Sequence, residues 1–202
     1  MDKQIIISIG REYGSGGHEI AEILAKDLNI PLLDNKLLTD IASKNNALGE
    51  KIKKYDEKPR NILLSKTIAG FASSIEENLA HLQFDYIKRQ AENGESFVVV
   101  GRCSEYILRD HPALVSFFIL GNTDTKCDRI MRKFGLTYDE ARRLMKKKDW
   151  TRKTYHNYYC DGKWGDSRNY DLCINVSRIG TDGCVIVLKE YLEQRFGNDY
   201  FI

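Results

Sequence analysis

Short apolar runs alternate with amphipathic segments along most of the chain. Four runs have the length and the β-branched or aromatic composition of buried strands, at residues 5–9, 97–100, 115–120 and 172–176. A further short apolar run lies at residues 31–33. Because these runs are apolar on both faces, they are typical of a sheet that helices cover on both sides. Their alternation with helices predicts a parallel α/β fold with right-handed crossovers.

In the segments between these runs, apolar residues recur at the intervals typical of helices. Between Ile20 and Leu28 apolar residues recur at intervals of three and four, which predicts a helix after the first run. Further helices are expected at residues 34–43, at about 60–73 and 75–93, and through Val185, Leu188, Tyr191 and Leu192. Residues 45–60 are polar and lysine-rich and are expected to form a loop or a frayed helix.

Three positions carry signals for helix ends. Gly94 after Asn93 is typical of a C-terminal stop. Asn122 follows the run at 115–120 and can cap the next helix. Residues 137–140 read Thr-Tyr-Asp-Glu, which is the capping-box pattern, and they open a strongly basic helix.

Composition limits the kind of protein. The chain has 202 residues, of which 42% are hydrophobic and 30% charged, which suits one domain with a sizeable core. The net charge of +2 makes a general nucleic-acid-binding surface unexpected, although a local basic cluster can bind phosphates. No apolar stretch approaches the ~20 residues that span a bilayer, and no secretion signal is evident, so we expect a soluble protein without a membrane partner.

The five cysteines give a further constraint. Their number is odd and none forms a C-x-x-C pair, which argues against a disulfide framework and against a zinc ribbon. Reduced and mostly buried thiols are expected, and they predict a cytoplasmic location.

The strongest local signal is a glycine-rich segment between the first predicted strand and the first predicted helix. Residues 10–18 read Gly-Arg-Glu-Tyr-Gly-Ser-Gly-Gly-His. Glycines allow the backbone to turn tightly and to approach an anion, while free amides and a helix N-terminus point at it. This predicts a phosphate loop in which Arg11, Gly14, Ser15, Gly16, Gly17 and His18 bind the phosphates of a nucleotide.

The loop departs from the standard pattern G-x-x-x-x-G-K-[ST]. It has one extra residue, Gly17 stands where lysine is expected, and no Ser or Thr follows. Arg11 and His18 are the available substitutes for the lysine, and Ser15 is the available hydroxyl for magnesium. Two simpler interpretations remain open, namely a glycine turn without a ligand and a solvated surface histidine at position 18.

Three segments together resemble the cytidylate kinase-like family. They are residues 5–17, residues 98–108, which read Val-Val-Val-Gly-Arg-Cys-Ser-Glu-Tyr-Ile-Leu, and residues 163–175, which begin Lys-Trp-Gly-Asp and end Tyr-Asp-Leu-Cys-Ile-Asn. The resemblance runs through nearly the whole chain and is weakest over residues 45–95. It implies a three-layer P-loop kinase fold with a five-stranded parallel sheet in a single domain, residues 1–202. Approximate subregions are a helical nucleotide-acceptor region at 34–95 and a basic helical lid at 136–168.

The resemblance also implies an activity and its residues. Members that are true cytidylate kinases transfer the γ-phosphoryl of ATP, with Mg²⁺, to CMP or dCMP. Arg102 matches the arginine that contacts the substrate nucleotide after the third strand. Asp110 resembles an acidic residue that faces the base, and Asp34 resembles the aspartate after the second strand. Asp149 and Arg152 match the lid motif, which makes them candidate catalytic residues together with Arg102.

Two arginines of the family pattern are missing. Met145 stands where the lid motif has its first arginine, although Lys146, Lys147 and Lys148 could compensate. The substrate-binding arginine that follows the aspartate at position 34 has no counterpart, since Asp40 lies near that place. These departures concern the identity of the acceptor more than the handling of phosphate.

The basic helix and the aromatic cluster after it allow two interpretations each. Arg142, Arg143 and the three lysines either belong to a lid that closes over phosphates or form a solvated helix face. Tyr155, Tyr158, Tyr159 and His156 either stack on a base or pack between lid and core, and packing is favoured, as it is for Trp150 and Trp164.

Three functions are therefore compatible with the sequence. The first is a nucleoside-monophosphate kinase that acts on CMP or dCMP, and the second is a kinase of another small molecule on the same fold. The third is a non-catalytic nucleotide-binding regulator, which the absent loop lysine favours. The aromatic tail, with Phe196, Tyr200 and Phe201, is expected to pack on a second subunit of a homodimer or back on the core.

Overall fold

The computed structural model describes residues 4–44 and 72–197 of the chain. The polar segment predicted at 45–60 and most of the helix predicted at 60–73 lie outside these residues, as do Tyr200 and Phe201. None of the helices in the described part is long and apolar enough to cross a membrane.

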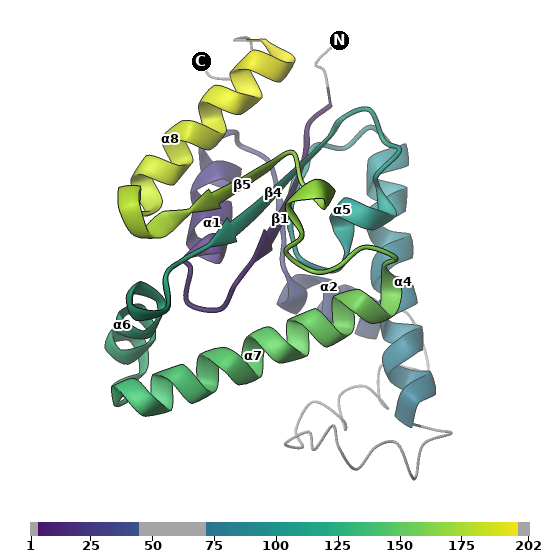
Figure 1. The fold of residues 1–202 in the computed structure, drawn as a ribbon. Helices are drawn as coiled ribbons and strands as arrows, with labels where there is room; N and C mark the ends of the chain where they lie inside the picture. The colour runs from purple at the N-terminus through teal and green to yellow at the C-terminus, as the bar shows by residue number, and fades with distance from the viewer. Residues whose placement is uncertain (1–3, 45–71, 198–202) are drawn as a thin grey trace.

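A five-stranded parallel sheet forms the centre of the molecule (Figure 1). Its strands are β1 (Ile6–Arg11), β2 (Leu32–Leu33), β3 (Phe97–Val100), β4 (Leu114–Leu120) and β5 (Leu172–Asn175), in the order β2-β3-β1-β4-β5. The central strand β1 pairs with β3 from Ile6, opposite Phe97, and with β4 up to Arg11, opposite Ile119. The predicted parallel α/β fold is confirmed, and its last strand ends one residue early because Val176 opens a helix.

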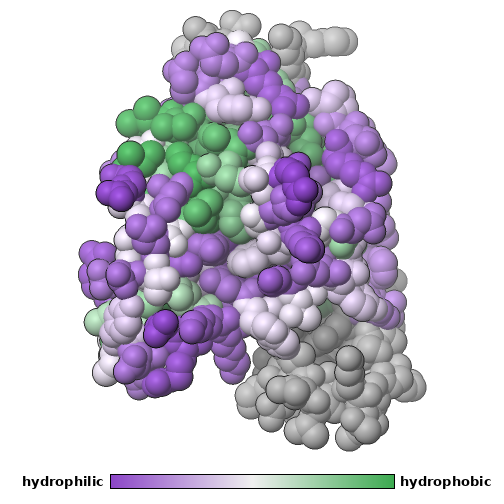
Figure 2. All heavy atoms as spheres, in the orientation of Figure 1, coloured by the Kyte–Doolittle hydropathy of each residue, from purple (hydrophilic) through white to green (hydrophobic). Residues whose placement is uncertain are grey.

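Helices cover both faces of the sheet, which gives three layers. On one face α1 (Gly17–Asp27) and α8 (Val176–Phe196) pack on alternate residues of β1, such as Ile7 and Ile9, and Phe196 is part of this packing. On the other face α2 (Asn35–Lys44), α4 (Ala72–Glu92) and the short α5 (Ser104–Ile107) pack around Ile6 and Val99. Figure 2 shows that the hydrophobic surface gathers over α8 and β5, where Ile186 is 69% exposed.

Two helices follow β4 and reach the carboxyl ends of the strands. They are α6 (Thr123–Phe134) and α7 (Tyr138–Tyr159), and α7 lies across the end of β1 (Figure 1). The predicted capping box is present, since Thr137 accepts from the amide of Glu140 and the Glu140 carboxylate accepts from the amide of Thr137. Asn122 occupies the N-cap position of α6, but its side-chain oxygen accepts a hydrogen bond from Asn175 rather than from an amide of the helix.

Candidate functional site

The glycine-rich segment forms the turn between β1 and α1, and its backbone requires glycine. Gly14 has a φ of 85° and Gly16 a φ of 82°, in the left-handed region that other residues avoid. A Cβ atom on Gly14 would lie 2.9 Å from the carbonyl oxygen of Lys126. The turn therefore packs closely against the start of α6, and the glycines fix its shape.

This turn leaves a row of amides available for a ligand. The amides of Glu12 and Tyr13 are used, by the carbonyl of Ile119 and by the Asp149 carboxylate. Within the described part of the chain, the amides of Gly14, Gly16, Gly17 and His18 donate to no protein group. Since α1 begins at Gly17, these donors coincide with the positive end of its dipole, which is a favourable place for an anion.

These amides border a cavity of about 560 Å³, which we call the loop cavity. Residues of the loop line it together with His18, Glu19 and Glu22 of α1, Arg129, Ile130, Lys133 and Phe134 of α6, and Arg152 of α7. A Cβ on Gly16 would lie 3.0 Å from Cζ of Arg129, so this guanidinium lies directly over the turn. Arg129 pairs with Glu19, and the exposed His18 pairs with Glu22 at 3.3 Å.

The cations of α6 were not among the residues predicted for the site. Lys126, Arg129 and Lys133 follow a helical spacing of three and four, which was the available signal. Lys126 is 5% exposed and its Nζ lies 2.7 Å from Oε2 of Glu12, so it braces the loop from behind. The loop lacks the standard lysine, and cations of a neighbouring helix lie beside it instead.

A second cavity of about 260 Å³, the inner cavity, lies on the other side of Arg11 and Arg152. Its walls come from α4, from the turn after β3, from α7 and from the segment that contains Trp164 and Tyr170. Arg102 lies in this wall with a φ of 60°, a strained conformation for a non-glycine residue. Its guanidinium stacks over the Tyr155 ring at 4.9 Å and donates to Gln83 at 3.4 Å.

Arg11 and Arg152 line both cavities, and with Arg102 they form a cluster of three guanidinium groups. The pKa of Arg11 is lowered well below its usual value, first by burial and then by repulsion from Arg152 and Arg102. The pKa of Arg152 is also lowered by burial. A cluster of partly desolvated cations is stabilised by an anion placed between them, and phosphate is the group that guanidinium binds in a bidentate manner.

Helix α7 is tied directly to the glycine loop. Arg152 donates from Nη1 to the carbonyl of Arg11 at 2.9 Å, and Oδ1 of Asp149 accepts from the amide of Tyr13 at 2.6 Å. Burial raises the pKa of Asp149, while Lys126 and Arg152 oppose that rise. Asp149 therefore positions the loop against α7, although it is not part of the lining of either cavity.

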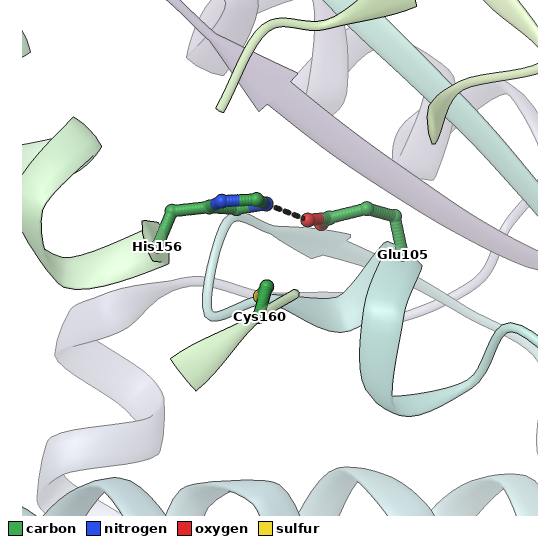
Figure 3. A group of neighbouring side chains, drawn as sticks. All are labelled: Glu105, His156 and Cys160. Atoms are coloured by element: carbon green, nitrogen blue, oxygen red, sulfur yellow. Dashed lines mark hydrogen bonds and ion pairs between the residues drawn. The ribbon is translucent and has the colours of Figure 1, made fainter. Parts of the chain in front are cut away.

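A buried polar cluster forms part of the floor of the inner cavity (Figure 3). His156 Nε2 lies 2.7 Å from Oε1 of Glu105, and the Cys160 thiol completes a group whose ligand-type atoms lie within 4.8 Å of one another. Burial alone lowers the pKa of His156, but hydrogen bonds to Cys160 and Glu105 raise it to about 10. A hydrogen bond from Cys103, together with His156, lowers the pKa of Cys160 to about 6.

The remaining residues predicted for the site are placed elsewhere. Ser15 is fully buried and its hydroxyl donates to the Glu12 carbonyl at 2.9 Å. Asp34 caps α2 through the amide of Leu37, and the exposed Asp110 lies 3.7 Å from Arg109. The side chains of Ser15, Asp34 and Asp110 line neither cavity.

The basic and aromatic residues of α7 divide between surface and cavity. The solvent-exposed group comprises Arg142, Arg143, Lys146, Lys147, Lys148, Trp150 and Tyr158. Tyr155, His156 and Tyr159 line the inner cavity, and the two tyrosines pack in a cluster with Phe84 of α4. Trp164 lines the same cavity and packs against Phe118 of β4. All five cysteines are free, and four of them are buried.

The order of the strands, the glycine turn after β1 and the helices on both faces define a P-loop kinase fold. The chain belongs to the cytidylate kinase-like family, whose sequence model matches residues 6–178. A comparison with curated proteins found no match.

Solved structures agree with this assignment. The chain is 40% identical to an uncharacterised protein from Eubacterium ventriosum, over 94% of this chain and 99% of that one, with a TM-score of 0.77. It shares the fold of a shikimate kinase from Bacteroides thetaiotaomicron, at 15% identity and a TM-score of 0.54, over 94% of this chain and 98% of that one. It also shares the fold of TT1252 from Thermus thermophilus, at 14% identity and a TM-score of 0.59, over 96% and 98% of the two chains. Family and fold together support a kinase.

Proposed function

We propose that this protein transfers the γ-phosphoryl of ATP to a nucleoside monophosphate, with CMP or dCMP as the acceptor that the family favours. One observation carries the proposal: the loop cavity and the inner cavity meet at Arg11 and Arg152. Phosphoryl transfer needs donor and acceptor oxygens on opposite sides of one phosphorus atom, with positive charge around its equatorial oxygens. A pair of arginines between two cavities meets both needs.

The loop cavity would hold the phosphates of ATP. Four free amides between Gly14 and His18 offer hydrogen bonds without breaking any existing one. The same turn excludes side chains, because a Cβ on Gly17 would lie 2.6 Å from Cβ of Arg11. Arg129 and Lys133 would add the charge that a loop lysine supplies in the standard motif.

Magnesium fits the oxygen groups near the loop. Mg²⁺, when bound with the nucleotide, would neutralise part of the charge of its phosphates. Oε2 of Glu12 already accepts from Lys126 and from the Gly121 amide, which leaves Oε1 of this carboxylate for a metal in the wall of the loop cavity, whereas the Ser15 hydroxyl is buried behind the turn. Ser15 would therefore act by holding the loop through Glu12, and Glu12 is the better candidate for the metal.

The inner cavity would hold the acceptor, with its phosphate between Arg102 and the two shared arginines. Arg102 would bind this phosphate, and Arg11 with Arg152 would stabilise the group in transfer. Residues 136–168, which include α7, would act as the lid that excludes water, and α7 already contacts the loop through Asp149. In this proposal the lid, the acceptor region and the loop would belong to a single domain.

The test is ADP release from ATP and Mg²⁺ in the presence of each common nucleoside monophosphate. We expect release that depends on one or two of them, CMP and dCMP first. Arg102→Ala should lower kcat/KM by about 10²- to 10³-fold, because a charged bidentate contact to phosphate is lost. Arg109→Ala is the matched control, since Arg109 lies seven residues later on the surface and stacks on Tyr106.

A second candidate is a kinase of another small molecule. Two observations favour it. The inner cavity, at about 260 Å³, is small for a ligand pocket, and neither Asp34 nor Asp110 lines it. A screen of hydroxylated metabolites with ATP separates the two candidates. ATP binding without turnover on any acceptor would instead indicate a nucleotide-binding regulator and contradict the proposal.

A further inference from the structure

The buried cluster at the floor of the inner cavity brings together two segments that are distant in sequence. Glu105 and Cys103 come from the turn and short helix after β3, and His156 and Cys160 lie one helical turn apart at the end of α7 (Figure 3). All four residues are at most 7% exposed. A carboxylate, an imidazole and two thiols thus share a desolvated site at the junction of lid and core.

An ion pair alone explains only part of this cluster. The hydrogen bond between Glu105 and His156, 2.7 Å long, satisfies the buried carboxylate and one ring nitrogen. Cys160 also hydrogen-bonds to His156, but thiols are weak hydrogen-bonding groups and the pair has no need of Cys103. The same four groups are the side chains that bind zinc in proteins, with nitrogen, oxygen and sulfur ligands in one shell.

The geometry is close to that of a binding site. Ligand atoms around a tetrahedral Zn²⁺ are about 3.3–3.8 Å apart, given bond lengths of about 2.0–2.3 Å. In the protein the ligand atoms of Glu105, His156 and Cys160 all lie within 4.8 Å of one another, with the closest pair at 2.7 Å. Side-chain rotations that move these atoms by about 1 Å would therefore place them around one ion.

We propose that Glu105, His156 and Cys160 bind a divalent cation of the zinc class, which joins the end of α7 to the start of α5. The charges balance, because one carboxylate and one thiolate neutralise the ion. The fourth position falls to a neutral ligand in the inner cavity, which Glu105 and His156 both line. The ion is separate from the magnesium that accompanies ATP, and the proposal does not depend on the reaction proposed above.

Cobalt is the direct probe. The intact protein, kept reduced with a phosphine and stripped of metal with a chelator, is titrated with Co²⁺. We expect near-ultraviolet absorption from sulfur-to-cobalt charge transfer that saturates at a single equivalent and is abolished by Zn²⁺. X-ray absorption of the zinc form should show sulfur at about 2.3 Å and lighter ligands at about 2.0–2.2 Å.

Two variants make the assignment specific. Cys160→Ser should lose the charge-transfer band and the stabilisation by Zn²⁺. Cys173→Ser should keep both, because Cys173 lies in β5 outside the cluster. In the wild-type protein, Zn²⁺ at about 100 times its dissociation constant should raise Tm by about 5–10 °C.

The wild-type measurement does not depend on the folding of any variant. The proposal is overturned if reduced wild-type protein gives no sulfur-to-cobalt band and no zinc-dependent rise in Tm. It is equally overturned if the band persists in Cys160→Ser, or if intact-mass analysis finds a Cys103–Cys160 disulfide and reduction of it yields no metal uptake.

Discussion

Three arginines from different parts of the chain converge where the two cavities meet. Arg11 ends the central strand, Arg102 follows β3 in a left-handed conformation, and Arg152 lies on α7. Burial, and then repulsion from Arg152 and Arg102, lowers the pKa of Arg11. In the function proposed above, a bound phosphate would add counter-charge to this preorganised cluster.

Arg152→Ala tests the role of this cluster in catalysis. We expect kcat/KM to fall by about 10³-fold, since one positioned arginine contributes that much to phosphoryl transfer. Arg143→Ala is the control on the same helix, because that side chain is exposed and lines neither cavity. Equal losses in the two variants, measured by steady-state kinetics, would argue for a general effect of charge on α7.

Gly101 sets the position of Arg11. Its φ is 72°, and a Cβ there would lie 2.3 Å from Nη1 of Arg11. Gly101→Ala should lower both stability and activity, because the new methyl group displaces the guanidinium. Gly94→Ala is the matched control, with a φ of 80° and open space around it, so it should cost only the left-handed strain of about 1–2 kcal/mol.

Denaturant unfolding and turnover of the two glycine variants separate strain from displacement. A Gly101→Ala protein as active as Gly94→Ala would show that Arg11 does not need its observed position.

Asp149 should make stability depend on pH. Burial raises its pKa above the ordinary 3.8, so the folded protein holds this proton more tightly than the unfolded chain. The contribution of Asp149 to stability is thus greatest below pH 3.8 and falls as pH rises through the raised pKa. Lys126, Arg152 and Glu12 are the charged groups that face it.

Asp149→Asn removes this titration and keeps an oxygen for the Tyr13 amide. The stability of the wild type relative to the variant, from denaturant unfolding, should therefore be higher near pH 4 than near pH 7. The opposite trend would mean that the cations around Asp149 outweigh its burial.

At the scale of elements, α6 carries cations beside a loop that lacks the standard lysine. The standard loop carries its own lysine, whereas here Arg129 of α6 lies over Gly16 and Lys126 braces Glu12. The shape of the loop therefore depends on the position of α6, since a Cβ on Gly14 would lie 2.9 Å from the carbonyl oxygen of Lys126.

Arg129→Ala tests this replacement through ATP affinity. We expect the Kd for ATP to rise by about 10-fold or more, because a charge-assisted contact to phosphate is lost. Arg132→Ala is the control three residues later, where the side chain donates to the Asp128 carbonyl and lines neither cavity. Unchanged ATP affinity in Arg129→Ala, measured by calorimetry, would leave Arg129 as a surface ion pair with Glu19.

At the scale of the whole molecule, the sequence predicted the features that depend on local patterns. It did not predict which distant residues pair. The apolar runs identified the strands, and the spacing of glycines identified the loop, because both depend on residues close in sequence. The resemblance to the family supplied Arg102 and Arg152, which the fold brings together in the lining of the inner cavity. Asp34 and Asp110 were carried over in the same way, but the fold places them at a helix cap and on the surface.

The rest of the site depends on contacts that no local pattern encodes. Glu105 and His156 are 51 residues apart, and only the end of α7 packing on α5 makes them neighbours. Cysteine spacing argues against a zinc ribbon, but it could not predict a ligand set assembled from two segments. The relevance of α6 likewise follows from how the helix packs beside the loop.

The central claim is that one phosphoryl group passes between the loop cavity and the inner cavity. The most direct measurement is calorimetric binding of a bisubstrate compound, adenosine joined to cytidine through five phosphates, compared with ATP. If both cavities are filled at once, the linked compound should bind about 10²-fold more tightly than ATP, and Arg102→Ala should remove that gain. Binding no tighter than ATP, together with no effect of Arg102→Ala, would contradict the account.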